Sequence, residues 1–125
     1  MSQMIVLVED DQDIGELVQR ELEKAGYLVF WRRNGYDGWD TIVSGRPHLA
    51  ILDVSLPGLS GLEVLKKMKA DAQTRQIPVM MASALGQQQD IVMAIRGGAV
   101  DYLVKPFSVA DMRERVERVL STQPH

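Results

Sequence analysis

The sequence predicts an α/β fold in which a parallel sheet of five strands has helices on both faces. Five short apolar runs recur along the chain, at residues 4–8, 28–31, 49–52, 78–82 and 99–104. Helical patterns lie between these runs, so strand and helix alternate five times, which is typical of a parallel sheet. The first, third and fourth runs are almost continuously apolar, as in strands that are covered on both faces.

The number of strands indicates their order in the sheet. Right-handed crossovers place helices on both faces of the sheet. Five strands suit the order 2-1-3-4-5, one of the two common orders of open doubly wound sheets, which is the flavodoxin-like (βα)5 arrangement. Strands 1 and 3 then flank the topological switch point, where ligands bind beyond the carboxyl ends of the strands.

The first helix is predicted from apolar residues at the spacing of one helix face, namely Ile14, Leu17, Val18 and Leu22. Asp13, together with Glu16, is expected to cap its start, and Gly26 to mark its end. Asn34 is expected to cap a second helix, which ends near Gly45 and carries Trp39, Ile42 and Val43.

Three more helices follow. Ser60 and Glu63 form a capping box in front of the third helix. The fourth helix has a weaker apolar pattern and stops at Gly97–Gly98, and the last helix begins at Ser108 with Asp111 three residues later. We expect one domain over residues 1–121, with 122–125 as a tail or the start of a linker.

The composition excludes several classes of function. The formal net charge of the 125 residues is −3, without a block of like charge, so a basic surface for nucleic acid is not expected. The chain has no cysteine, which excludes disulfides, thiol catalysis and thiolate metal ligands. No stretch approaches the roughly 20 apolar residues of a membrane span, and the N-terminus lacks the features of a signal peptide. We therefore expect a cytoplasmic protein.

Polar groups stand at the carboxyl ends of four of the five predicted strands: Glu9 and Asp10, Asp53, Ser83, and Lys105. The second strand, at the expected edge of the sheet, is followed by Arg32 and Arg33 instead. Because the carboxyl ends of parallel strands share one rim, the four sets are expected to lie together. A divalent cation there would neutralise the acids.

The donor set indicates which cation. The donors are hard oxygens with no His or Cys nearby in the sequence, which favours Mg²⁺, or Mn²⁺, over zinc. Mg²⁺ commonly binds one or two carboxylates, several waters and phosphate oxygens. A carboxylate in such a site can attack phosphorus and form an aspartyl phosphate. Lys105 and the hydroxyl of Ser83 would then stabilise charge on the phosphoryl oxygens.

Four segments resemble, in order and spacing, the signature of bacterial response-regulator receiver domains: "VEDD", "ILDVSLPGLSG", "MMASA" and "DYLVKPF". The resemblance covers essentially the whole chain. It implies that Asp53 is the phosphoacceptor and also a metal ligand. It implies that Asp10 binds Mg²⁺ directly, that Ser55 contributes its backbone carbonyl, and that Glu9 acts as the second acid, from behind the ligands or through a water.

The resemblance also implies how the domain works. A sensor histidine kinase or a phosphotransfer protein donates the phosphoryl group, which Ser83, Ala84 and Lys105 contact. The Ser83 hydroxyl moves to a phosphoryl oxygen, Tyr102 turns into the vacated space, and the face of the fourth helix, fifth strand and fifth helix changes. By the same likeness the Lys105–Pro106 bond is cis. Tyr102 read by itself would be a half-buried core aromatic.

Other roles are implied more loosely. Ser55 and Leu85 are expected to tune the lifetime of the phosphoryl group. A kinase is expected to contact Ile14, Leu17, Val18 and Phe107. Asp101, Asp111 and Arg115 match part of the charged set through which winged-helix relatives form homodimers on phosphorylation, whereas Ile91 and Val100 depart from it.

The same residues bear on competing functions. Haloacid-dehalogenase-like phosphatases place a second Asp two residues after the nucleophile, where this chain has Ser55, so turnover of external substrates is not expected. A flavodoxin-like FMN module would need a Ser/Thr/Gly-rich loop in place of the acids that follow the first strand. A receiver-like interaction module without phosphorylation stays open, although such domains usually lack one of the key residues.

The output is open as well. Transcriptional regulation, a diguanylate-cyclase-type output and a stand-alone phosphorelay protein are all compatible with the sequence. We expect no direct contact with nucleic acid or membrane. The methionines are expected to fill the core, and His48 to have a structural role.

Overall fold

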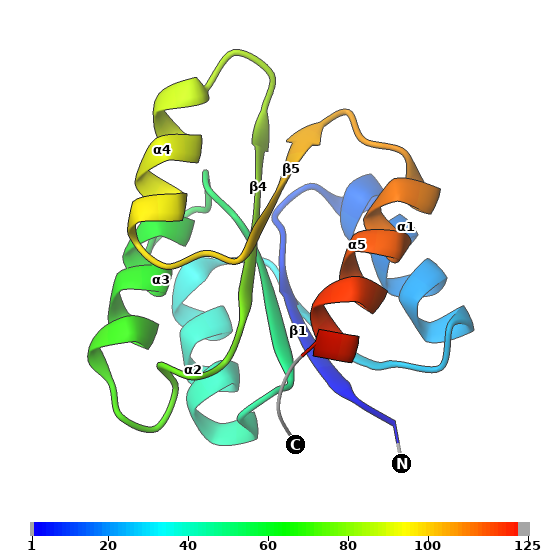
Figure 1. The fold of residues 1–125 in the computed structure, drawn as a ribbon, viewed down its shortest axis with the longest axis horizontal. Coiled ribbons are helices and arrows are strands. Elements are labelled where there is room, and N and C mark those ends of the chain that lie inside the picture. Colours follow the sequence, from blue (N-terminus) through cyan, green and yellow to red (C-terminus); the bar gives the residue numbers. More distant parts are fainter. Residues whose placement is uncertain (1, 123–125) are drawn as a thin grey trace.

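A computed structural model describes residues 2–122 and has three layers, with the sheet between two layers of helices (Figure 1). The strands are β1 (Met4–Val8), β2 (Leu28–Arg32), β3 (Leu49–Asp53), β4 (Val79–Ala84) and β5 (Asp101–Lys105). All pairings are parallel, and the order is β2-β1-β3-β4-β5. The predicted fold class and strand order are therefore confirmed.

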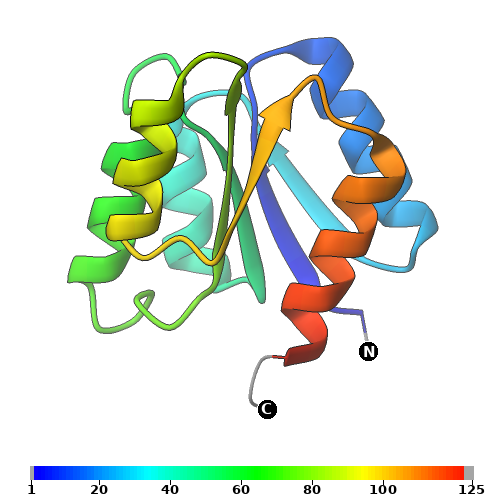
Figure 2. The ribbon, with the colours of Figure 1, turned by 45° about the horizontal axis from the view of Figure 1, so that its top comes forward.

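The helices lie on both faces of the sheet, as the right-handed crossovers require. They are α1 (Gln12–Lys24), α2 (Gly35–Gly45), α3 (Gly61–Ala70), α4 (Gln88–Arg96) and α5 (Val109–Thr122). Figures 1 and 2 show α1 and α5 on one face and α2, α3 and α4 on the other. No helix within residues 2–122 is long and apolar enough to cross a membrane.

The apolar strands are buried on both faces. Ile5 and Leu7 of β1 pack into the core layer that includes residues of α1 and α5, and Val6 and Val8 pack into the layer on the α2–α3–α4 side. This alternation follows from the two-residue period of a strand. All five residues of β3 are buried, which explains why the central strands read as continuous apolar runs.

The start of α1 differs from the expectation. Asp11, and not Asp13, is the N-cap: its Oδ1 accepts the backbone N–H of Ile14 at 3.0 Å, and the helix begins at Gln12. Asp11 has extended backbone angles, which an N-cap requires, whereas Asp13 already lies in the first turn. An acid there is favourable because of the positive end of the helix dipole. At the other end, Gly26 adopts a φ of +98° after the last turn, as expected.

The other predicted helix starts are confirmed. The Oδ1 of Asn34 accepts the N–H of Asp37 at 2.8 Å. Ser60 and Glu63 form the reciprocal capping box in front of α3, with bonds of 3.2 and 3.1 Å. The Oγ of Ser108 accepts the N–H of Asp111 at 2.9 Å at the start of α5.

The boundaries of β2, β3 and β4 differ from the apolar runs by one or two residues, and those of β5 and α5 differ from the expectation as well. β5 begins at Asp101, two residues after the start of its apolar run, because the N–H of Ala99 still bonds the carbonyl of Ala94 and completes the end of α4. α5 extends to Thr122, one residue into the expected tail, and residues 123–125 lie outside the described residues.

Among the methionines that the structure describes, Met93 lies outside the core. Met68, Met80, Met81 and Met112 are buried, whereas Met93 is 57% exposed on α4. Val92 and Ile95 of the same helix are also exposed, so the expectation that the methionines fill the core is wrong for Met93.

Candidate functional site

The strand-end residues meet at the carboxyl edge of the sheet, as the strand order requires. Carboxylate oxygens of Glu9, Asp10 and Asp53 all lie within 4.8 Å of one another. Asp53 is the last residue of β3, and Glu9 and Asp10 follow β1 directly. Glu9 and Asp53 are buried, with exposed fractions of 3% and 6%, whereas Asp10 is exposed. The predicted gathering of acids at the switch point is therefore present.

Lys105 joins two of these acids. Its Nζ lies 2.5 Å from Oδ2 of Asp53 and 2.7 Å from Oε1 of Glu9. The remaining carboxylate oxygens accept backbone donors: Oδ1 of Asp53 accepts the N–H of Ser55 at 3.0 Å, and Oε2 of Glu9 accepts the N–H of Asp11 at 3.1 Å. Both buried carboxylates are thus held from two sides.

The charges in this cluster do not balance. The pKa of Glu9 is raised to about 7, chiefly because the carboxyl is buried; the bond to Lys105 opposes this rise, and the neighbouring Asp53 adds to it. Burial alone would lower the pKa of Lys105, but its bonds to Asp53 and Glu9 outweigh this, so the pKa is raised. One lysine therefore does not neutralise three carboxylates. The donor set, all carboxylate oxygen, is chemically suited to a hard divalent cation.

Close backbone packing holds the phosphoacceptor candidate in place. A Cβ at Gly61 would lie 2.0 Å from the carbonyl oxygen of Asp53, so only glycine allows α3 to begin against the end of β3. The N–H of Gly61 also donates to the carbonyl of Val54 at 2.9 Å. In the intervening loop Gly58 has a φ of +77°, which favours glycine. The "PG" and "SG" dipeptides after Asp53 therefore shape this side of the site.

Ser83 and Tyr102 are hydrogen-bonded to each other through their hydroxyl groups. Ser83 is fully buried at the end of β4, and Tyr102 is half-buried on β5. Ala84 is exposed beside them, and its N–H donates to Oε1 of Gln87 at 3.2 Å. The Lys105–Pro106 bond is cis, as expected from the resemblance.

Arg115 pairs with Asp101 and Asp111, the other two residues that were expected on a dimer face. Its Nη1 lies 2.7 Å from Oδ1 of Asp101 on β5, and its Nε lies 3.0 Å from Oδ2 of Asp111, one turn away on α5. The bond to Asp111 is the main reason that the pKa of Arg115 is raised. The charged set is thus satisfied within one chain.

The residues expected to contact a kinase differ in how far they are exposed to solvent. Val18 is 2% exposed and packs in the core, so it is not available to a partner, whereas Ile14, Leu17 and Phe107 are half-buried. The helical period places Val18 on the core face of α1.

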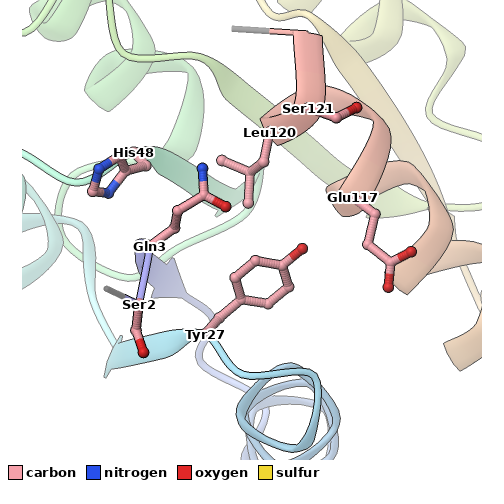
Figure 3. A pocket seen from close by; sticks show the side chains of 7 residues that line it. All are labelled: Ser2, Gln3, Tyr27, His48, Glu117, Leu120 and Ser121. Atoms are coloured by element: carbon pink, nitrogen blue, oxygen red, sulfur yellow. The ribbon is translucent and has the colours of Figure 1, made fainter. Parts of the chain in front are cut away.

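A separate hollow of about 580 Å³ lies at the other end of the sheet, at the amino end of β1 (Figure 3). It is open to solvent and is lined by Ser2, Gln3, Tyr27, His48, Glu117, Leu120 and Ser121. His48 has the structural role that was expected, because its Nδ1 accepts the backbone N–H of Met4 at 2.9 Å and its backbone N–H donates to the carbonyl of Met4 at 2.8 Å.

Two residues that local patterns did not identify lie at the end of β2: Trp31 on the strand and Arg33 directly after it. The indole Nε1 of Trp31 donates to the carbonyl of Glu9 at 2.9 Å, and Nη2 of Arg33 donates to the carbonyl of Asp10 at 2.8 Å. From the sequence, Arg33 was noted only as a residue that follows the edge strand, and Trp31 and Arg33 were assigned no role at the site. No local signal identifies these contacts, because both depend on the pairing of β1 with β2.

The comparisons with known proteins agree with this geometry. The profile of the family described as "Response regulator receiver domain" matches residues 5–117. The chain belongs to this family.

Curated relatives extend beyond the region that this chain matches. The "DNA-binding dual master transcriptional regulator RpaA" of Synechocystis sp. is 41% identical over 93% of this chain and 48% of its own length. The "Phosphate regulon transcriptional regulatory protein PhoB" of Pseudomonas aeruginosa is 36% identical over 93% of this chain and 51% of its own length. The receiver chain thus spans about half the length of these relatives.

Solved structures have the same fold. A CheY-like response regulator receiver domain protein from Methanospirillum hungatei has a TM-score of 0.91 at 26% identity, covering 98% of this chain and 97% of its own. NtrX from Brucella abortus has a TM-score of 0.90 at 34% identity, covering 98% of this chain and 28% of its own. This receiver domain is therefore similar to a solved chain of about its own length and to part of a longer one.

Proposed function

We propose that this receiver domain accepts a phosphoryl group from the phosphohistidine of a sensor histidine kinase or phosphotransfer protein onto Asp53. The observation that carries the proposal is the setting of the Asp53 carboxylate, which lies 2.5 Å from the ammonium of Lys105 and beside the acidic pair that follows β1. A carboxylate oxygen of Asp53 attacks phosphorus, the bond from phosphorus to the imidazole nitrogen breaks, and the electron pair leaves with the imidazole.

The proposed metal site uses Asp10, Asp53 and the backbone carbonyl of Ser55 as ligands, with Glu9 acting through water. Bound Mg²⁺, or Mn²⁺, supplies positive charge to the phosphoryl oxygens. Lys105 contributes a second positive charge. The N–H of Ala84, which now donates to the side chain of Gln87, is a donor for a phosphoryl oxygen once that side chain moves.

The switch is proposed to act through Ser83 and Tyr102. The two hydroxyls are bonded to each other, so a Ser83 hydroxyl that turns towards a phosphoryl oxygen releases Tyr102 from its present partner. The position of Tyr102 on β5 couples this change to the surface of α4, β5 and α5. Phosphorylation would thus bias an equilibrium between two conformations.

The surrounding biology is proposed from the same evidence. The domain catalyses only the uptake and loss of its own phosphoryl group, with Ser55 and Leu85 tuning the lifetime of that group, and it works in the cytoplasm. Residues 1–121 form the functional unit. Because the relatives are named as transcriptional regulators of about twice this length, we propose a transcriptional output; a diguanylate-cyclase-type output and a stand-alone phosphorelay role are the alternatives.

A homodimer formed through α4, β5 and α5 on phosphorylation is a second proposal. Asp101, Asp111 and Arg115 are the candidate residues, and exchange of their internal ion pairs between two copies would connect the protomers. Sedimentation velocity before and after treatment with beryllofluoride tests this. A monomer that is unchanged by beryllofluoride would exclude the dimer.

The phosphorylation proposal is tested by intact mass after incubation with acetyl phosphate, with Mg²⁺ or with EDTA. We expect a gain of one phosphoryl group that requires Mg²⁺ and is absent in Asp53→Asn. Asp40→Asn, which changes an exposed carboxylate on α2, serves as the matched control and should gain the group. Folded protein that gains no phosphoryl group would contradict the proposal and leave an interaction module without phosphorylation.

A further inference from the structure

We propose that Trp31 and Arg33 are positioning residues that hold the backbone of Glu9 and Asp10, and thereby set the affinity of the acidic site for a divalent cation. The inference rests on the metal site proposed above. Trp31 lies on β2, and Arg33 directly follows that strand. Neither residue is among those to which the proposed phosphoryl chemistry is assigned.

The first observation is a pair of hydrogen bonds to consecutive carbonyl groups. The indole N–H of Trp31 donates to the carbonyl of Glu9 at 2.9 Å, and the guanidinium of Arg33 donates to the carbonyl of Asp10 at 2.8 Å. The two donors also contact each other, since the guanidinium carbon of Arg33 lies 5.7 Å from the centre of the Trp31 ring. They therefore act as one unit.

The second observation is that the carbonyls of Glu9 and Asp10 lie beyond the end of the sheet and accept no backbone hydrogen bond from a neighbouring strand. Val8 is the last residue of β1 that pairs with β3, and the N–H of Glu9 makes the last ladder bond to β2, to the carbonyl of Arg32 at 3.0 Å. Within residues 2–122, no backbone N–H donates to the carbonyl of Glu9 or of Asp10. The side chains of Trp31 and Arg33 supply the bonds that the ladder no longer provides.

The third observation is that the three carboxylates are not held equally. Glu9 is held by Lys105 and by the N–H of Asp11, and Asp53 is held by Lys105 and by the N–H of Ser55. Within residues 2–122 the carboxylate of Asp10 makes no hydrogen bond or ion pair, and the residue is exposed. Its direction is therefore set by its backbone.

Repulsion between the carboxylates explains why the backbone of Glu9 and Asp10 needs these hydrogen bonds. Three carboxylates whose oxygens lie within 4.8 Å of one another repel, and the loop relieves that repulsion if the exposed Asp10 turns away. Rotation of the peptide groups on either side of Asp10 would break the bonds to Trp31 and Arg33. The two donors thus keep the acids together before a cation arrives, which lowers the free-energy cost of binding it.

The indole is itself fixed by packing. A Cβ at Gly15 would lie 2.0 Å from the Trp31 ring, so α1 lies directly on the ring, and only glycine fits there. Glycine within a helix costs about 1 kcal/mol relative to alanine. Glycine at position 15 therefore lowers the stability of α1, but it allows the indole to lie beside the acidic loop.

The test is calorimetric measurement of Mg²⁺ binding to the unphosphorylated domain. Trp31→Phe keeps an aromatic ring against Gly15 and removes the N–H donor, and Arg33→Met removes the guanidinium at an exposed position. Each loses one hydrogen bond to the loop, so we expect the Kd for Mg²⁺ to rise about threefold to tenfold in each variant. Arg33→Lys keeps a charged donor and should recover part of the loss. Trp39→Phe and Arg20→Met, which change the same residue types away from the loop, should bind as the wild type does.

A second readout separates positioning from general damage. In phosphorylation by acetyl phosphate, the Mg²⁺ concentration at half-maximal rate should rise with the Kd, while the rate at saturating Mg²⁺ stays within about twofold of wild type. Far-UV circular dichroism and thermal melting verify that each variant is folded.

The outcomes distinguish the two proposals. If the wild type binds Mg²⁺ and the folded variants bind it as tightly, this inference alone is overturned. A reduced maximal rate at unchanged Mg²⁺ affinity would also overturn it. A wild-type domain that binds no Mg²⁺ would overturn the proposed metal site and this inference with it.

Discussion

The Nζ of Lys105 lies 2.5 Å from Oδ2 of Asp53, although the two residues are 52 positions apart in the chain. The same ammonium reaches Oε1 of Glu9 at 2.7 Å, so one cation connects the ends of β1, β3 and β5. All three side chains are largely buried. Burying a carboxylate without a partner is costly, and the lysine compensates two of them.

Replacement of this lysine should destabilise the domain in a way that Mg²⁺ partly reverses. Lys105→Met leaves Glu9 and Asp53 facing each other, so we expect the free energy of unfolding to fall by on the order of 2–4 kcal/mol at pH 8 in EDTA. Added Mg²⁺ should recover part of this loss, because a divalent cation restores positive charge between the carboxylates. Urea unfolding followed by circular dichroism measures both effects.

The control for this variant is Lys66→Met, which removes an exposed lysine on α3. It should change the free energy of unfolding by no more than about 0.5 kcal/mol. If Lys105→Met lost no more stability than this control, the ammonium would not be the compensating charge of the cluster.

The raised pKa of Glu9 predicts an unusual dependence of stability on pH in EDTA. The folded pKa is about 7, above the ordinary value of 4.5, so the folded state binds the proton more tightly than the unfolded chain. The stabilisation from this group is complete below pH 4.5 and is lost as pH rises towards and through 7. Wild-type protein should therefore lose on the order of 1 kcal/mol or more relative to Glu9→Gln between pH 5 and pH 8.

Glu23→Gln is the matched control, because Glu23 is an exposed glutamate on α1. The difference between wild type and this control should stay nearly constant over the same pH range. A constant difference between wild type and Glu9→Gln would mean that Glu9 titrates as an exposed glutamate does.

The contact between Gly15 and Trp31 reverses the usual effect of alanine in a helix. Gly15→Ala would normally stabilise α1 by about 1 kcal/mol. Its methyl group would lie 2.0 Å from the indole, so we expect a net loss of about 1–3 kcal/mol from overpacking. Chemical unfolding of Gly15→Ala measures this loss directly.

The double variant Gly15→Ala/Trp31→Leu identifies the cause. With the indole removed, alanine at position 15 should be neutral or stabilising relative to Trp31→Leu alone. A loss of the same size in both backgrounds would show that some other neighbour rejects the methyl group.

The hydroxyl pair of Ser83 and Tyr102 should behave as a coupled unit. Tyr102→Phe leaves the buried hydroxyl of Ser83 without this partner, which costs about 1–2 kcal/mol. Ser83→Ala in addition removes the orphaned group, so the double variant should lose less than the sum of the two single variants. Tyr36→Phe, at a residue that is 60% exposed, is the control and should change little. Strict additivity would contradict the coupling.

Much of the fold and of the chemistry could be predicted from local patterns. Strand and helix periodicity predicted the five-stranded parallel sheet, and the common order for five such strands was the observed one. The strand ends predicted that Glu9, Asp10, Asp53, Ser83 and Lys105 gather at one rim. Most helix starts followed from capping residues as well. The start of α1 did not, because Asp11 and Asp13 are both suitable caps, and the backbone angles at Asp11 decided between them.

The tertiary structure alone decided how that cluster is held. Which carboxylates Lys105 touches depends on side-chain paths across three strands, and the raised pKa of Glu9 depends on burial, which no local pattern records. The roles of Trp31 and Arg33 arise from the pairing of β1 with β2, which brings residues 22 and 23 positions apart into contact. The sequence by itself determined the types of residue at the rim, because strand period and chain order are local properties. Their mutual distances and charge balance came from packing, because those depend on segments that are remote in the chain.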